Sequence, residues 1–249
     1  MEFSFDGIGS AAQSMSPAAI PTGHNNKGFF KRALMNLFII AFMFGFVELY
    51  TFCLGSGNGL IGLTISLAII SFWRTDIGIK PLQGAFVIWG AFLLTGGATF
   101  LASFHPAIGV FVNFASIYTI LTLTSHQPMA KAYYPILSCY LFAQSSPVYG
   151  IDYGLRMIGI AGGGLIVAII YYIRHRKVKR RRNITDIFRE THFCSIRTKF
   201  FIRLTTGLTI AMLIGDFYHV LKPAWISFTV LSLVHPFVNE SRKKIVYRI

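Results

Sequence analysis

The chain has 249 residues, of which 54% are hydrophobic and only 13% are charged. Soluble domains carry about one-quarter charged residues, so this composition excludes an ordinary soluble domain and favours an all-α, polytopic membrane protein. The formal net charge is +14, but the basic residues lie between apolar runs, which argues against nucleic acid as a partner.

The N-terminal region divides into a polar tail and a first apolar run. Residues 1–30 are rich in Ser, Ala, Gly and Asn with little apolar periodicity, which predicts a disordered cytoplasmic tail. The run 34–54 follows Lys27, Lys31 and Arg32. It is about 20 residues long, which is longer than the apolar core of a cleavable signal, so we expect it to stay as the first membrane helix.

Seven further apolar runs follow, separated by Gly, Pro, His or charged breaks. The pattern therefore predicts about eight transmembrane helices, of which the second and eighth are short and require tilt or burial to cross the bilayer. The further runs are 57–73, 82–103, 106–125, 132–148, 154–173, 200–221 and 223–239.

The distribution of Lys and Arg predicts the orientation. If the N-terminus is inside, eight crossings leave only Arg156 and Lys222 at external helix ends, and most of the other basic residues fall in internal loops. The positive-inside rule then places both termini in the cytoplasm.

The densest charge run comes directly after the sixth apolar run. We expect it to attract anionic lipid headgroups, each residue contributing about 1 kcal/mol near the surface. Residues 184–198 have apolar positions spaced by three or four, which predicts a short amphipathic helix in this linker. The basic positions are Arg174, Arg176, Lys177, Lys179, Arg180, Arg181 and Arg182.

The chain also contains an internal similarity. A shift of 168 residues overlays runs seven and eight on runs one and two without a gap. We interpret residues 31–173 as a six-helix unit, 174–198 as a linker and 199–249 as the first helical pair of a truncated, parallel second unit; chance similarity between apolar helices is the alternative. The shift pairs Lys31 with Lys199, Glu48 with Asp216, Tyr50 with Tyr218, Arg74 with Arg242, and Lys80 with Arg248.

At these residues the chain resembles the FUSC family of membrane proteins, which includes aromatic acid exporters and is distantly related to aluminium-activated malate transporters. The stretch "KPAWISFTVLSLVHPFVNESRKKIVYRI" is similar to the family's aromatic turn, Thr-Val run and basic end. The first copy, "GNGLIGLTISLAIISFWRTDIGIKPLQG", follows the pattern more weakly, with Pro81-Leu82-Gln83 where Gly-Thr is expected. The stretch "LRMIGIAGGGLIVAII" is similar to the family's sixth helix.

The resemblance implies a multi-pass transporter of the inner (plasma) membrane that exports aromatic or other hydrophobic organic anions. Its expected partners are anionic lipids, the organic anion and either a second copy or a chain that completes the second unit. A passive anion channel is one alternative, and a non-transporting scaffold or truncated remnant is another. An enzyme is disfavoured because HExxH, GxSxG and usable paired acids are missing from the sequence.

Three ionisable residues inside apolar runs are the first site candidates, because charge in a membrane is costly. Arg156 offers fork geometry to a carboxylate substrate, and Glu48 or Asp216 would neutralise it in the empty site. Protonation of the acid would then release the arginine and couple transport to protons. A static ion pair or snorkelling to headgroups is the alternative.

Other candidates have weaker support. His105 and His235 precede Pro residues, where capping of a helix is the usual role. The small residues 161–164 favour close helix packing. Cys53, Cys139 and Cys194 lack the spacing of a metal site or a disulfide framework, and we expect no cofactor. Further candidates for the substrate site are Tyr50, Tyr218 and Trp225, and the basic positions of the family motif are Arg74, Lys80, Arg242 and Arg248.

Overall fold

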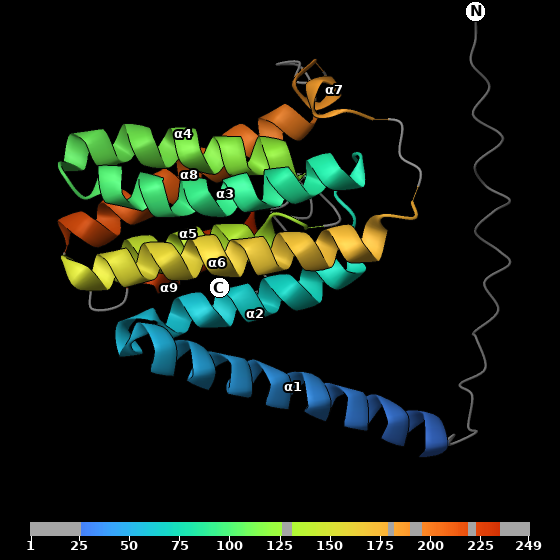
Figure 1. The fold of residues 1–249 in the computed structure, drawn as a ribbon. Coiled ribbons are helices and arrows are strands. Elements are labelled where there is room, and N and C mark those ends of the chain that lie inside the picture. The colour runs from blue at the N-terminus through green and yellow to red at the C-terminus, as the bar shows by residue number, and fades with distance from the viewer. Residues whose placement is uncertain (1–25, 126–130, 179–181, 190–195, 219–222, 235–249) are drawn as a thin grey trace, which may run out of the picture. The chain divides into compact units, whose positions relative to one another are not determined.

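The computed structural model describes residues 26–125, 131–178, 182–189, 196–218 and 223–234, and these contain helices and no strand (Figure 1). The predicted all-α class is therefore confirmed for this part of the chain. The chain forms two compact units, residues 1–41 and 42–249. The first helix, α1 (Asn26–Leu54), begins in the first unit and ends in the second.

The later helices begin close to the predicted positions. Both α3 and α4 start at a proline, which lacks the backbone N–H that a first helical position leaves unpaired. The elements after α1 are the short 3₁₀ helix η1 (Ser56–Asn58), α2 (Gly59–Arg74), α3 (Pro81–Ala102), α4 (Pro106–Thr124), α5 (Tyr134–Ser145), α6 (Ile151–His175), α7 (Ile184–Arg189), α8 (Ile196–Phe217) and α9 (Pro223–Leu233).

Six of the described helical segments are long and apolar enough to cross a membrane, which supports the membrane class. The predicted fifth span is shorter in the structure. The 12 residues of α5 rise about 18 Å, against about 30 Å of hydrocarbon. For α9 the described part is 11 residues long.

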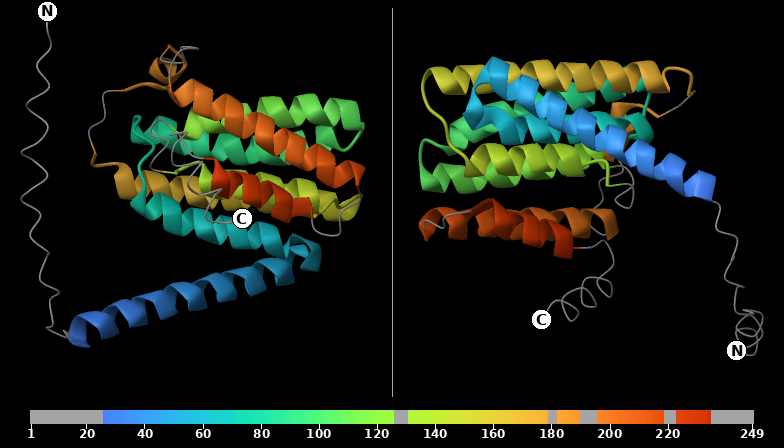
Figure 2. Two further views of the ribbon diagram at one scale, coloured as in Figure 1. Left: turned by 180° about the vertical axis from the view of Figure 1, so that it is seen from behind. Right: turned by 90° about the horizontal axis from the view of Figure 1, so that it is seen from below.

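In the second unit, α5 lies inside the helical bundle and packs against α2, α3, α4 and α9 (Figures 1 and 2). Because α5 is surrounded largely by protein, its length need not match the bilayer. Most of its side chains are buried, namely Pro135, Ile136, Leu137, Ser138, Cys139, Tyr140, Leu141 and Ala143.

Glycines let α6 pack closely against its neighbours α2 and α3. A Cβ at Gly164 would lie 2.6 Å from Cβ of Phe92 on α3, and a Cβ at Gly163 would overlap the Ile65 side chain of α2. The packing interpretation is therefore confirmed for Gly163 and Gly164.

The two ends of the bundle in this unit differ in charge. At one end, which we call the basic end, α2, α4 and α6 finish and α3, α5 and α8 begin. At the other end, which we call the cavity end, Arg156 is the one Lys or Arg among the described residues. The described cations at the basic end are Arg74, Lys80, Lys131, Arg174, Arg176, Lys177, Arg182, Arg197, Lys199 and Arg203.

The linker at the basic end is held by the loop before α3. The backbone N–H of Lys80 donates to the carbonyl of Arg182 at 3.1 Å, and the N–H of Ile184 donates to Oε1 of Gln83 at 3.1 Å. The described helix α7 ends at Arg189, and Ile196 already belongs to α8. Within the predicted amphipathic stretch 184–198, residues 184–189 are helical and residues 196–198 belong to α8, while residues 190–195 lie outside the described part of the chain.

Candidate functional site

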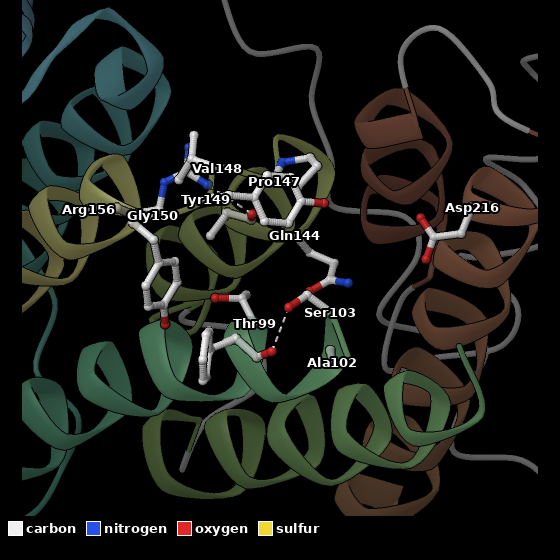
Figure 3. A pocket seen from close by; sticks show the side chains of 13 residues that line it. Thr99, Ala102, Ser103, Gln144, Pro147, Val148, Tyr149, Gly150, Arg156 and Asp216 are labelled. Atoms are coloured by element: carbon white, nitrogen blue, oxygen red, sulfur yellow. Dashed lines mark hydrogen bonds between the residues drawn. The ribbon is translucent and has the colours of Figure 1, made fainter. Parts of the chain in front are cut away.

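A cavity of about 450 Å³ opens at the cavity end of the second unit (Figure 3). The last turns of α3, the loop from α5 to α6, the first turns of α6 and the end of α8 surround it. This volume lies within the range of small-molecule sites, about 300–1,000 Å³. Its lining combines the aromatic rings of Phe100, Tyr149 and Tyr153 with the polar side chains of Thr99, Ser103, Gln144, Arg156 and Asp216.

Arg156 lines this cavity and connects three segments of the chain. Its Nε–H donates to Oδ1 of Asn58 at 2.9 Å, and Nη2 donates to the Gly57 carbonyl at 3.0 Å. Its Nη1 donates to the carbonyl of Ala143 at 3.2 Å and to that of Ser146. The guanidinium therefore connects the start of α6 with the turn between α1 and α2 and with the end of α5.

These partners leave the charge of Arg156 in place. Carbonyl and amide oxygens carry no net charge, and the carbonyls of Ala143 and Ser146 belong to the C-terminal end of α5, where a cation is favoured by the helix dipole. Four hydrogen bonds occupy most of the five N–H groups of a guanidinium. Arg156 therefore contributes a positive potential to the cavity. It has too few unpaired N–H groups to bind a substrate carboxylate with the predicted fork geometry.

Asp216 lines the same cavity as Arg156, although the two residues are 60 positions apart in the sequence. In Figure 3 it projects from α8 across the cavity from Arg156, with Gln144 between them in this view. Glu48 is exposed on α1 and is not part of the lining. Of the three predicted ionisable residues, two are brought together.

The two tyrosines paired by the predicted repeat have different environments. Tyr50 is 8% exposed, and it packs so closely that a Cβ at Gly62 would lie 2.8 Å from its ring. Tyr218 is 70% exposed. The position equivalent to Gly62 under the shift is Val230, which carries a branched side chain where Gly62 has none. The repeat itself remains a prediction.

The other predicted candidates lie away from the cavity. Trp225 is exposed on α9, and Arg74 and Lys80 are exposed at the basic end. Nδ1 of His105 accepts a hydrogen bond from the N–H of Ala107 at 3.2 Å, which confirms its capping role. The remaining candidates lie outside the described residues: His235, Arg242, Arg248, Lys179, Arg180 and Arg181.

Arg174, the first residue of the basic run, contacts an aromatic ring. The guanidinium of Arg174 lies over the Trp73 ring, 5.6 Å from its centroid, while Arg176, Lys177 and Arg182 are exposed. Indole rings and cationic side chains are both favoured at the headgroup level of a membrane. The arrangement suits the predicted attraction to anionic lipids.

Sequence reasoning missed the cavity residue Gln144 and two hydrogen-bond partners of Arg156. Gln144 is a polar residue within the predicted fifth span, and this position alone was a signal of an internal site. Asn58 and Ser146 sit in turns of ordinary composition. Their role depends on a guanidinium that comes from a distant segment, so no local signal marks them.

No family model, curated protein or solved structure matches this chain.

Proposed function

We propose that this chain is a transporter of the FUSC type, which moves aromatic or other hydrophobic organic anions across the inner (plasma) membrane. One observation carries the proposal. At the cavity end, aromatic rings and a buried guanidinium without a carboxylate among its hydrogen-bond partners line a cavity of the size of a small organic molecule.

The lining suits an amphiphilic anion. The rings of Phe100, Tyr149 and Tyr153 offer apolar surface to an aromatic group. The positive potential of Arg156 attracts a carboxylate, and in a partly water-excluded site this attraction is stronger than in water. The amide of Gln144 supplies a donor, and its Oε1 has no hydrogen-bond partner among the described residues. Asp216 opposes anion binding when it is ionised, so its protonation is the proposed coupling step.

The charge asymmetry supports export as the direction. With the basic end in the cytoplasm, as the positive-inside rule favours, the cavity faces outward. An outward cavity next to Asp216 is where an exported anion would leave. In this proposal the protein crosses the membrane eight times, and α5 contributes a pass that is shielded by its neighbours.

The experiment is efflux of radiolabelled benzoate from liposomes that contain the purified full chain. The variant is Gln144→Leu, which removes the amide from the lining but keeps a similar volume. Its matched control is Ile151→Ala, because Ile151 is 85% exposed in the neighbouring turn and does not line the cavity. We expect Gln144→Leu to reduce the efflux rate about tenfold, a loss of about 1.4 kcal/mol of binding, and the control to keep it.

The outcomes separate the alternatives. Efflux that requires a proton gradient supports a coupled transporter, whereas efflux that follows an imposed membrane potential without one identifies a passive anion channel. Liposomes that retain benzoate under both conditions, with correctly folded protein, would contradict transport and favour the scaffold.

A further inference from the structure

Three polar residues of α8 lie on one face of the helix. Thr205, Thr209 and Asp216 are separated by four and seven residues. At about 100° per residue these spacings keep the three side chains within about 40° of one another. Since Asp216 lines the cavity, the two threonines continue the same face from the cavity toward the middle of the bundle.

The two threonines are buried without a hydrogen-bond partner. Thr205 is 0% exposed and Thr209 is 6% exposed, and neither hydroxyl is paired within the described part of the chain. Other helical threonines in this protein donate to the carbonyl four residues earlier, as Thr95 and Thr124 do. An unpaired buried hydroxyl costs about 1–3 kcal/mol, so two on one face indicate that something else pairs with them.

A second, smaller cavity with polar lining residues lies deeper in the bundle than the first. It has a volume of about 10 Å³ and lies between Met212, Asp216, Gln144 and Ser227, one turn deeper along α8. This is close to the space that one water molecule needs. Gln144, whose Oε1 is unpaired within the described part of the chain, lines both cavities.

The middle of the neighbouring helix is also polar. α4 packs against α8 and carries Asn113 and Ser116, which are 4% and 5% exposed. The hydroxyl of Tyr140 on α5 donates to Oδ1 of Asn113 at 2.6 Å. Polar groups at this depth of a membrane bundle are costly and are typical of water-filled or substrate pathways.

We propose that the face of α8 formed by Thr205, Thr209 and Asp216 lines a hydrated pathway, which leads from the cavity into the bundle and which the transported organic anion follows. This inference rests on the proposed function. The hydroxyl hydrogens donate to water in the empty pathway and to the carboxylate of the passing anion. Hydroxyl donors carry no charge, so they bind an anion weakly enough to release it.

The test is the reaction of introduced cysteines with a negatively charged, water-soluble methanethiosulfonate in proteoliposomes. The background protein carries Cys53→Ser and Cys194→Ser and keeps the fully buried Cys139. The test variants are Thr205→Cys and Thr209→Cys. The controls on the same helix are Leu208→Cys, which is 0% exposed, and Ile210→Cys, which is 49% exposed on the outside of the bundle.

We expect both threonine positions to react at least ten times faster than the two controls. Equal rates at all four positions would overturn the pathway. A second measurement uses Thr209→Val, which removes the hydroxyl but keeps the shape. We expect benzoate efflux to fall severalfold in a variant that elutes as a folded protein, and unchanged efflux would count against the pathway.

Cysteine labelling tests the hydrated pathway, and efflux by the unaltered protein tests the proposed transport function. Cysteine labelling needs only water in the pathway and no transport. Efflux by the unaltered protein together with unreactive threonine positions would overturn the pathway alone. Absence of efflux by the unaltered protein would overturn the proposed function, and with it the passage of the anion along α8.

Discussion

A single side chain, that of Arg156, connects the packing of the second unit with the charge of its cavity. It pairs with oxygens from the turn before α2, from α5 and from the loop before α6. These acceptors hold the guanidinium in place but leave its net charge uncompensated. A fixed cation of this kind attracts an anion without the cost of rearranging the site when the anion arrives.

Replacing Arg156 should therefore first affect stability. In Arg156→Met the carbonyls of Gly57, Ala143 and Ser146 lose their donor. We expect the free energy of unfolding to fall by about 3 kcal/mol, since an acceptor left unpaired in a buried site costs about 1–3 kcal/mol and water replaces part of the loss. Thermal unfolding in detergent measures this, with the exposed Arg176→Met as control. Equal melting temperatures for the two variants would contradict the structural role.

Tyr50 and Tyr218, which the predicted repeat pairs with each other, should contribute differently to stability. Tyr50→Ala should lower the free energy of unfolding by about 3 kcal/mol, because it empties a buried space between α1, α2 and α6. Tyr218→Ala should change it by less than about 0.5 kcal/mol, because Tyr218 is 70% exposed. Unfolding of both variants in one detergent compares them directly. Similar losses would show that the two tyrosines are equivalent after all.

The close packing of helix α6 requires glycine on the side that faces α2 and α3. A Cβ at Gly164 would lie 2.6 Å from Cβ of Phe92, whereas a Cβ at Gly162 would meet nothing within 4 Å. Gly164→Ala should therefore destabilise the protein by about 1–3 kcal/mol through overpacking. Gly162→Ala should be neutral or stabilising by up to about 1 kcal/mol, because Ala is the better helix former. If thermal unfolding ranks the two variants in the opposite order, the packing of α6 on α3 is different from that described.

Hydropathy predicted the positions of the long helices because an apolar run of sufficient length leaves few other structures in a membrane. It did not predict the short, enclosed α5. An apolar segment such as 132–148 has the same composition whether it faces protein or lipid, so hydropathy does not distinguish the two cases. Arg156 and Asp216 were predicted as site residues from their charge alone. Their shared cavity, and the partners Asn58 and Ser146, depend on segments far apart in the sequence, which no local pattern connects.

Across the second unit, charge and cavity lie at opposite ends of the helices. The loops and first turns at the basic end carry nearly all the described cations, and the Trp73 ring lies beneath Arg174. The cavity end carries Glu48, Asp152 and Asp216. A membrane with anionic lipids and a negative interior potential favours the basic end inside. The proposed outward orientation of the cavity rests on this asymmetry and can be measured directly.

Cysteine accessibility in intact cells measures that orientation. Tyr149 is 74% exposed at the mouth of the cavity, and Lys177 is exposed at the basic end. In a background that carries Cys53→Ser and Cys194→Ser, we expect Tyr149→Cys to react with a membrane-impermeant maleimide in intact cells. We expect Lys177→Cys to react only after permeabilisation. The reverse result would place the cavity toward the cytoplasm, where it would receive the anion before export, and Asp216 would then take its proton from the cytoplasmic side.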